Sequence, residues 1–373
     1  KAQSITVKYL LPAGMCMAEQ PLLRLQGLVK KFGEFTALNN VDLDIKEGEF
    51  FTIVGPSGSG KSTLIRLLVG MDDVSEGQIL LRGERIDQTP ANLRPTCMVF
   101  QSLALFPHMS VGQNIEFPLK IRNENASQRR KRALELLDLL RLPRNYYDKR
   151  ISQCSGGERQ RVALARALAF DPEILFFDEP LSALDYRLRK TLEKELKDLH
   201  ARTGKTFVYI THSLEEAMVM SDRIAIMKEG KFEQVAKADE IYAQPISRFV
   251  AEFMGEVNLF EFKVKDNGTY ESDAITIDRN INIPGAKGFK TGILMVRPEY
   301  MHFIKGKEKY NFTLSGKLHG EYALGSRIQY EFETVAGNIT VEKLREDRLS
   351  ANLGDLIELG FNLDITHFIG ETK

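Results

Sequence analysis

Apolar and polar positions follow two different patterns along this chain, and the change lies near residue 245. Before it, short apolar runs alternate with long amphipathic stretches. Strands are predicted at four apolar runs, which are FFTIVG (50–55), CMVFQ (97–101), EILFFDE (173–179) and TFVYITH (206–212). Helices are predicted where apolar residues recur every three or four positions, at 126–142, 156–169 and 187–203. Alternating strands and helices are typical of an α/β domain.

The stretch 126–142 has a clear amphipathic pattern. Basic residues RRKR occupy 129–132, and the apolar face consists of Ala133, Leu134, Leu136, Leu137 and Leu140. A helix with one apolar stripe packs that stripe against a core. We therefore expect the leucines to be buried and the basic residues to face solvent.

Beyond about residue 255 the helical pattern fades. Alternating runs such as SRIQYEFET (326–334) and GDLIELGF (354–361) are separated by Gly and Asn turns, which predicts a small all-β barrel or sandwich. The bridge 238–256 has a helical pattern and contains Pro245. The predicted organisation is an N-terminal extension (1–21), an α/β domain (22–250) and a β-rich domain (251–373).

The first 17 residues, KAQSITVKYLLPAGMCM, carry only a short apolar patch. A signal peptide would have a longer apolar region. We interpret this segment as a weakly ordered extension, or as sequence upstream of a start at Met15 or Met17.

Composition narrows the class of partner. Of the 373 residues, 43% are apolar, and the 51 basic residues are balanced by 51 acidic ones. This balance disfavours nucleic acid as the main partner, because binding to phosphates needs a surplus of basic residues. The three cysteines, Cys16, Cys97 and Cys154, have unrelated spacings that predict neither a disulfide framework nor a zinc site. Such usage fits a reducing cytosol. No apolar run reaches the roughly 20 residues needed to span a bilayer, so any membrane part would come from other chains.

The strongest chemical motif is GPSGSGKST, which follows the predicted strand 50–55 and precedes the apolar stretch TLIRLLVG. It matches the phosphate-binding pattern G-x-x-x-x-G-K-[ST], in which glycines turn backbone N–H groups toward a β-phosphate. Lys61 is expected to reach the β- and γ-phosphates and Ser62 to ligate Mg²⁺. The predicted phosphate-binding residues are Gly55, Pro56, Ser57, Gly58, Ser59, Gly60, Lys61, Ser62 and Thr63.

Two carboxylates end the buried run ILFFDE. Asp178 and Glu179 come at the carboxyl end of this strand, the edge at which parallel sheets bind ligands. We expect Asp178 to hold Mg²⁺ and Glu179 to orient and polarise the attacking water. A DE pair alone is a weak signal, since such pairs also cap helices.

Two further polar residues follow predicted core strands. His212 ends the run 206–212, at the level expected for a γ-phosphate, and Gln101 ends the run 97–101. An amide at that place can contact Mg²⁺ or the attacking water. Each residue alone is equally compatible with a structural role.

The stretch QCSGGERQRVALARAL (153–168) places two glycines at a helix start without a Lys-Ser sequence. Ser155 and Glu158 form an S-x-x-E capping box, which predicts a helix that begins at Gly156. Uncovered N–H groups at Gly156 and Gly157 form an anion-binding terminus. A glycine-opened structural helix is the alternative. Given the motif at 55–63, we expect this terminus to complete the phosphate site of another subunit.

Over roughly 22–245 these motifs resemble the ATP-binding subunits of ABC transporters. GPSGSGKST is similar to Walker A, ILFFDE to Walker B, CSGGERQ to the signature motif and SALD (182–185) to the D-loop, while Gln101 and His212 resemble the Q-loop glutamine and switch histidine. All six occur in the family's order. Phe32 resembles the aromatic residue that stacks on adenine, with core packing as the alternative, and Asp185 joins the predicted nucleotide contacts.

The resemblance implies a P-loop NTPase fold: an ABC cassette with a RecA-like core and a helical subdomain, followed by an all-β OB-like (TOBE-like) barrel. It also implies ATP and Mg²⁺ as cofactors, with Ser62, Gln101 and Asp178 at the metal. Glu179, His212 and Lys61 would be catalytic. Two copies would form a head-to-tail homodimer around ATP, in which Ser155, Gly156 and Gly157 contact the partner's nucleotide.

Two departures concern the signature motif, which in this family most often begins Leu-Ser-Gly-Gly-Gln. Cys154 is interpreted as a packing substitute, with redox sensing as an alternative. Glu158 keeps the capping role and adds a negative charge near a phosphate site, which predicts slightly weaker ATP binding without loss of activity.

The segment QSLALFPHMSVGQNI (101–115) resembles importers, in which this region docks on a short helix of the permease. That resemblance implies two transmembrane permease subunits, an external solute-binding protein as an indirect partner, and a place at the cytoplasmic face of the inner membrane. The strings FMGEVNLFEF (253–262) and GILMVRPEYMHF (292–303) are most similar to the spermidine/putrescine branch. Iron, opine, sulfate and sugar importers are alternatives for the solute.

Two further alternatives stay open from the sequence. A soluble ABC ATPase acting on DNA or ribosomes is disfavoured by the neutral charge and the single cassette. The β-rich domain either binds a solute or regulatory protein or extends the dimer interface. Arg297, Glu299 and Glu321 are candidate ligand-binding residues there, or members of a solvated face.

Overall fold

The computed structural model describes residues 20–182, 184–265, 269–278, 281–286, 288–306 and 308–370. The predicted extension falls outside this part except for its last two residues. The chain forms two compact units. The first unit contains the described chain up to Phe51, together with Gly58–Ile210 and Glu229–Lys231. The second unit contains Thr52–Ser57, Thr211–Lys228 and the chain from Phe232 onward. The predicted boundary at 250/251 stays a prediction.

The first unit combines antiparallel strands, parallel strands and helices. Its elements are β1 (Leu23–Phe32), β2 (Phe35–Ile45), the start of β3 (Phe50–Val54), α1 (Lys61–Val69), β4 (Glu76–Leu81), β5 (Glu84–Arg85), β6 (Thr96–Val99), α2 (Val111–Ile121), α3 (Ala126–Leu139), α4 (Gly156–Leu168), β7 (Ile174–Asp178), α5 (Tyr186–Thr203) and β8 (Thr206–Ile210). The antiparallel sheet has the order β2-β1-β4-β5. Strands β6, β7 and β8 pair in parallel, in the order β8-β7-β6.

The parallel strands confirm the predicted apolar runs. β7 and β8 are buried along nearly their whole length because both faces are covered. β6 ends at Val99, so Gln101 lies in the following turn rather than in a strand. Because β6, β7 and β8 are parallel, their carboxyl ends lie at one edge of the sheet, which is the edge where ligands are expected.

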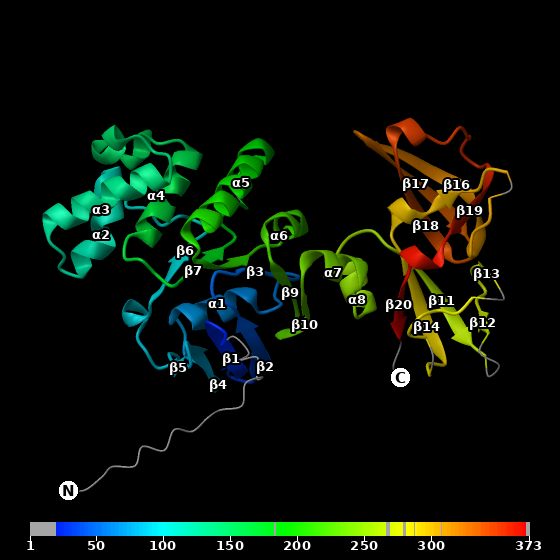
Figure 1. The fold of residues 1–373 in the computed structure, drawn as a ribbon, viewed down its shortest axis with the longest axis horizontal. Helices are drawn as coiled ribbons and strands as arrows, with labels where there is room; N and C mark the ends of the chain where they lie inside the picture. The colour runs from blue at the N-terminus through cyan, green and yellow to red at the C-terminus, as the bar shows by residue number, and fades with distance from the viewer. Residues whose placement is uncertain are drawn as a thin grey trace, which may run out of the picture. The chain divides into compact units, whose positions relative to one another are not determined.

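Helices α3, α4 and α5 confirm the three predicted helices. The predicted end of the first at 142 is wrong: α3 ends at Leu139, because Arg141 adopts a left-handed conformation with φ +54°. Its apolar stripe is buried at Ala133, Leu136 and Leu137, as expected. α2, α3 and α4 pack against one another (Figure 1), and form the helical part of the unit.

The second unit contains the remaining elements. They are the rest of β3, α6 (Leu214–Met220), β9 (Arg223–Lys228), β10 (Lys231–Ala236), α7 (Ala238–Ala243), α8 (Arg248–Phe253), β11 (Asn258–Val264), β12 (Tyr270–Glu271), β13 (Thr276–Ile277), β14 (Thr291–Val296), β15 (His302–Phe303), β16 (Phe312–Leu324), β17 (Arg327–Thr334), β18 (Gly337–Leu344), β19 (Leu356–Phe361) and β20 (His367–Gly370). The helical pattern predicted over 238–256 is present as two short helices, α7 and α8. Pro245 lies between α7 and α8, since proline disfavours helical conformation in the residue before it.

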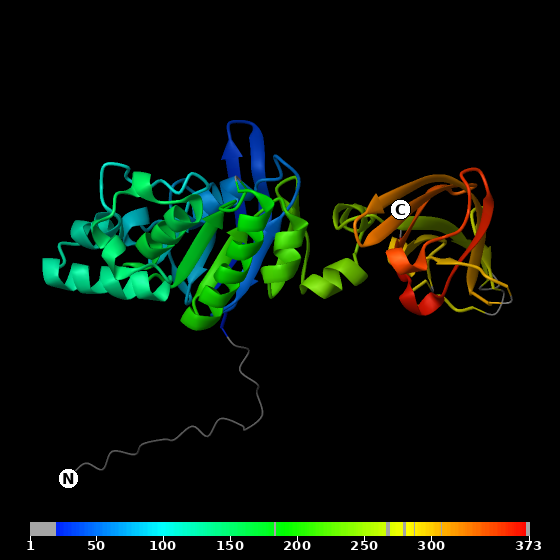
Figure 2. The same ribbon diagram turned by 90° about the horizontal axis from the view of Figure 1, so that it is seen from above.

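The strands beyond residue 257 form two curled antiparallel sheets (Figure 2). Their orders are β12-β11-β14-β20 and β15-β19-β16-β17-β18, with β13 beside β16. The rings of Phe260, Phe361 and Phe312 stack in series at centroid distances of 5.2 and 4.9 Å in the shared core. Asn258 links the sheets, because its amide bonds both the N–H and the carbonyl of Thr340, at 2.9 and 2.7 Å. This arrangement agrees with the predicted OB-like barrel.

In the described ranges, none of the helices combines the length and the apolar character that crossing a bilayer requires.

Candidate functional site

The loop 55–63, which is predicted to bind phosphate, connects the buried strand β3 to helix α1. In the first unit, Gly58 and Gly60 have φ values of +78° and +107°, which favour glycine. A Cβ atom on Gly60 would lie 2.9 Å from the Ala37 carbonyl oxygen and from Leu38, so a side chain does not fit there. Gly60 is also the N-cap residue of α1, and as a glycine it makes no side-chain capping bond to the helix. A helix N-terminus without a side-chain cap is a favourable place for an anion.

Lys61 is a buried cation beside two carboxylates. Its side chain is 7% exposed, and its Nζ lies 3.4 Å from the Ser59 hydroxyl, to which it donates. Burial lowers the pKa of Lys61, and the nearby carboxylates Glu179 and Asp178 oppose this shift. Burial and the charge of Glu179 raise the pKa of Asp178, while Lys61 lowers it. The structure thus brings together three of the residues that the sequence assigned to catalysis and metal binding.

Glu179 directly follows β7 in an unusual backbone conformation. Its φ is +46°, a left-handed value that is disfavoured for a residue with a side chain. Its N–H donates to the Ile210 carbonyl at 3.0 Å. Its own carbonyl accepts from the Ser182 hydroxyl at 2.9 Å, and that hydroxyl accepts from the Gln101 amide at 2.9 Å. Strained backbone of this kind is common where a catalytic group must be aimed.

The second unit holds Gly55, Pro56, Ser57 and His212. The N–H of Thr211 donates to the Ile53 carbonyl at 3.3 Å, which places the residue before His212 beside the end of β3. The Thr211 hydroxyl donates to the Glu216 carboxylate at 2.8 Å and anchors the start of α6. The His212 side chain is exposed. Within this unit, His212 therefore follows a residue that is bonded to β3, the strand from which the loop 55–63 starts.

Helix α4 begins with the predicted capping box, which is confirmed. The Glu158 N–H donates to the Ser155 hydroxyl at 3.3 Å, and the Ser155 N–H donates to the Glu158 carboxylate at 2.8 Å. Glu158 also accepts from Tyr146 at 3.0 Å and pairs with Lys149 at 3.2 Å. The expected negative charge near a phosphate site is therefore compensated by a neighbouring lysine. A Cβ atom on Gly157 would lie 3.2 Å from the Leu188 side chain of α5, so a side chain at this position would be tightly packed.

Replacing Glu158 with Gln is expected to keep the cap and lose the ion pair with Lys149. The Ser155 N–H, with smaller help from Tyr146 and Lys149, lowers the pKa of Glu158 from 4.5 to about 2. A lowered folded-state pKa stabilises the fold above pH 4.5, and this stabilisation is lost as the pH falls toward 2. The variant should melt slightly below wild type at pH 7, and the difference should shrink at pH 4. A difference that grows on acidification would contradict this account.

Cys154 is a buried packing residue. Its side chain is largely shielded, its sulfur lies 3.6 Å from the Arg150 carbonyl, and burial raises the pKa of the thiol. Reactive cysteines have lowered pKa values and exposed thiols. The packing interpretation is supported and redox sensing is not.

Phe32 and Asp185 have different surroundings. The Phe32 ring is 50% exposed at the end of β1, with the Lys30 ammonium 4.8 Å from its centre, so the core-packing alternative is wrong.

Asp185 is the N-cap residue of α5, and its carboxylate accepts a hydrogen bond from the Leu188 N–H at 3.0 Å. This capping role was not predicted from the sequence.

The turn after β6 carries features that the sequence analysis missed. Leu103 and Ala104 have positive φ values of +59° and +45°. The Arg166 guanidinium of α4 donates to both of their carbonyls, at 2.7 and 2.6 Å. No local pattern links residues more than 60 positions apart, so this brace had no signal in the sequence.

Beside this turn lies an apolar groove of about 290 Å³. Its lining includes Phe100, Ala104, Phe106, Phe117, Ile121 and Phe170. Two of its lining residues, Ala104 and Phe106, belong to the segment 101–115 that the sequence associated with docking.

In the β-rich part, Arg297 is not a ligand-binding residue. It is 1% exposed, and its guanidinium donates to the carbonyls of Ala251, Gly255, Glu256 and Tyr242 at 3.0 to 3.3 Å. Both interpretations from the sequence, ligand site and solvated face, are wrong for this residue. Glu321 pairs with Arg348 at 2.7 Å.

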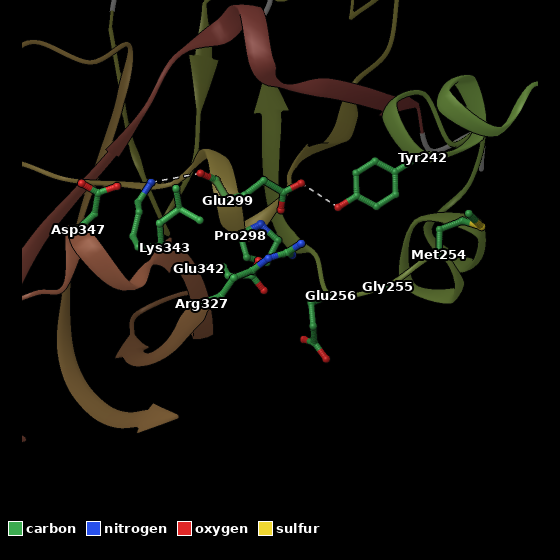
Figure 3. Close-up of a pocket in the computed structure, with 11 residues that line it drawn as sticks. Tyr242, Met254, Gly255, Glu256, Pro298, Glu299, Arg327, Glu342, Lys343 and Asp347 are labelled. Carbon is green, nitrogen blue, oxygen red and sulfur yellow. Dashed lines mark hydrogen bonds and ion pairs between the residues drawn. The ribbon is translucent and has the colours of Figure 1, made fainter. Parts of the chain in front are cut away.

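Glu299 lines a cavity of about 630 Å³ (Figure 3). Its carboxylate accepts from the Tyr242 hydroxyl at 2.8 Å, and its backbone carbonyl accepts from Lys343 at 3.1 Å. Arg327 and Glu342 pair on another wall at 2.8 Å. The three candidates from the sequence therefore do not form one site.

Comparison with known proteins agrees with these motifs. A family described as ABC transporter matches residues 38–182. The spermidine/putrescine import ATP-binding protein PotA of Roseobacter denitrificans is 46% identical over 289 residues, covering 76% of this chain and 79% of that protein. The protein of the same name from Chromobacterium violaceum is 40% identical over 364 residues, covering 94% and 99%.

Solved structures show the same cassette. The dimeric ATP-binding cassette MJ0796, in a post-hydrolysis state bound to ADP and Pi, is 36% identical with a TM-score of 0.51, covering 58% of this chain and 98% of that one. The cbiO1 protein of Clostridium perfringens, part of the ABC transporter complex cbiONQ, is 29% identical with a TM-score of 0.56, covering 60% and 92%. The chain therefore belongs to the ABC transporter family, among the ATP-binding proteins that include those of spermidine/putrescine import.

Proposed function

We propose that this protein hydrolyses ATP to power the import of spermidine and putrescine through a separate membrane permease. The observation that carries the proposal is the match of 94% of this chain to 99% of a spermidine/putrescine import ATP-binding protein at 40% identity. The match includes the β-rich part as well as the cassette. Import of another solute, namely iron, opine, sulfate or sugar, is the alternative and concerns the substrate alone.

The proposed nucleotide site is built on the loop 55–63. The N–H groups of the loop and of the first turn of α1 surround the phosphates, and the Lys61 ammonium contacts the β- and γ-phosphates. Glu179 orients the attacking water and accepts its proton, while His212 contacts the γ-phosphate. The exposed Phe32 ring stacks on adenine. The buried position of Lys61 near the carboxylates of Glu179 and Asp178 supports these roles.

The proposed Mg²⁺ ligands are the Ser62 hydroxyl, the Asp178 carboxylate and the Gln101 amide oxygen. All three are hard oxygen donors, which suit Mg²⁺. Within the described ranges, no group of three or more His, Cys, Asp or Glu side chains is arranged to hold a metal alone. A cation that takes its other ligands from phosphate and water fits such a site. When bound, it neutralises charge on the transferred phosphoryl group.

The proposed dimer places Ser155, Gly156 and Gly157 of one copy, with Asp185, at the ATP of the other. The capping box keeps the N–H groups of this terminus in place without a lysine in the motif. The dimeric cassette at 36% identity supports this assembly. Glu158 then stays turned toward Lys149.

The proposed docking site for the permease is the apolar groove at Phe106 and Ile121, with the protein at the cytoplasmic face of the inner membrane. Two permease subunits would each receive one copy, and an external binding protein would deliver the solute. The groove is apolar in a part of the chain that resembles the docking segment of importers.

Replacing Ile121 with Glu should abolish co-purification with the permease, because a carboxylate in the groove opposes apolar docking. Ile121 is 64% exposed, so the folded chain tolerates the change. Leu93 is 66% exposed and does not line the groove, and Leu93→Glu is the matched control. The measurement is mass spectrometry of the native protein pulled down from membranes. Abundant RNA or DNA without any permease would instead favour a soluble ABC ATPase.

A further inference from the structure

The turn Glu179–Ser182 connects the end of β7 to the segment before α5. Glu179 holds a left-handed φ of +46°, a conformation that neighbouring contacts must maintain. Ser182 supplies two of these contacts, because its N–H and its hydroxyl both donate to the Glu179 carbonyl, at 3.3 and 2.9 Å. The backbone that carries the proposed base therefore depends on a serine three residues later.

The same hydroxyl determines how the Gln101 amide is oriented. A backbone carbonyl only accepts hydrogen bonds, so the Ser182 hydroxyl donates its single proton to the Glu179 carbonyl. It can then only accept from Gln101, whose amide nitrogen lies 2.9 Å away. The amide must present its NH₂ group to Ser182, and its oxygen, the atom that ligates a cation, lies on the other branch. Ser182 thus links the orientation of Gln101 to the conformation of Glu179.

The turn is fixed from two other sides. The Glu179 N–H is held by the Ile210 carbonyl of β8 at 3.0 Å. The Pro180 carbonyl lies 3.5 Å from the amide nitrogen of Gln160, a buried residue of α4. Both of these partners belong to regular elements. The Gln101 bond is different, because it comes from the turn at Leu103 and Ala104 beside the apolar groove.

We propose that Ser182 is a positioning residue for ATP hydrolysis, whose hydroxyl couples the amide of Gln101 to the backbone of Glu179. The inference rests on the proposed function. In this arrangement a shift of the Gln101 turn changes the Ser182 bond and thereby the aim of the Glu179 carboxylate. Ser182 does not contact the nucleotide in this role.

The test measures steady-state ATP hydrolysis of the purified full-length chain. Ser182→Ala should lower kcat about 5- to 10-fold, the loss expected from one or two ordinary hydrogen bonds, and leave the KM for ATP within about 2-fold. Ser182→Thr keeps a hydroxyl and should stay within about 2-fold of wild type. Thr191→Ala is the control, because the Thr191 hydroxyl donates to the Arg187 carbonyl within α5, at 3.1 Å, away from the turn.

A double-mutant cycle separates coupling from a local packing effect. If the hydroxyl relays Gln101 to Glu179, Gln101→Ala with Ser182→Ala should be no slower than the slower single variant. Independent effects that multiply, a failure of threonine to restore kcat, or a loss confined to KM would each overturn the inference. Normal kcat in Ser182→Ala, with hydrolysis abolished in Glu179→Gln, would overturn it and leave the proposed function standing. An inactive wild-type chain that binds no ATP would overturn both.

Discussion

Replacing Glu179 with Gln should reduce ATP hydrolysis at least about 100-fold, the low end of what removal of a general base costs. The substitution keeps the shape of the side chain and removes its capacity to accept a proton. The backbone bonds of Glu179 to Ile210 and Ser182 do not involve the carboxylate, so the turn should be retained. ATP-dependent dimerisation should survive, because phosphate binding depends on the loop 55–63 and on α4.

The measurement combines phosphate release with size-exclusion chromatography in the presence of ATP. Glu173→Gln is a suitable control, since Glu173 precedes the same strand β7 but is partly exposed and pairs with Arg82 at 2.6 Å. It should hydrolyse ATP at the wild-type rate. Normal hydrolysis by Glu179→Gln would show that the base is another residue.

Replacing Arg297 with Ala should destabilise the β-rich part by about 3–5 kcal/mol. The change leaves four carbonyl oxygens without their charged donor, and hydrogen bonds to a charged group contribute about 1.5–3 kcal/mol each, although such losses are not additive. It also removes a guanidinium that lies 4.2 Å from the centre of the Tyr242 ring. The side chain is fully buried, so a cavity adds to the loss.

Differential scanning calorimetry of the full chain should show the transition of the second unit lowered by roughly 10 °C. The transition temperature of Arg297→Lys should lie between those of wild type and Arg297→Ala, because a lysine ammonium keeps the positive charge but lacks the planar fork of guanidinium donors. Arg248→Ala, which removes a solvent-exposed pair with Glu261, should cost less than about 0.5 kcal/mol. A transition within 2 °C of wild type for Arg297→Ala would mean that the buried contacts add no net stability.

Local patterns predicted much of this fold. The apolar runs at β7 and β8 and the periodicity of α3, α4 and α5 were sufficient, because burial on one or both faces imposes these spacings. The capping box at Ser155 and Glu158 was also predictable, because all the groups that form it lie within four residues of one another. The loop 55–63 was recognisable because positive φ values require glycine at two of its positions, Gly58 and Gly60.

Features that depend on distant residues were not predictable. The antiparallel sheet of β1, β2 and β4 contains register shifts that interrupt its alternation of apolar and polar residues. Arg297 looked like a surface residue because the carbonyls that bury it lie about 40 to 55 positions earlier. Ser182 was visible only as part of a motif, because its bond to Gln101 spans 81 positions. Backbone acceptors carry no sequence signal, so polar side chains that bind them are hard to assign.

The central claim is that this chain powers polyamine import, and uptake of radiolabelled spermidine and putrescine tests it most directly. A strain that lacks this chain should lose uptake of both compounds, wild-type protein should restore it, and Glu179→Gln protein at equal abundance should not. Unchanged uptake in the deletion strain would contradict the account, as would full restoration by Glu179→Gln.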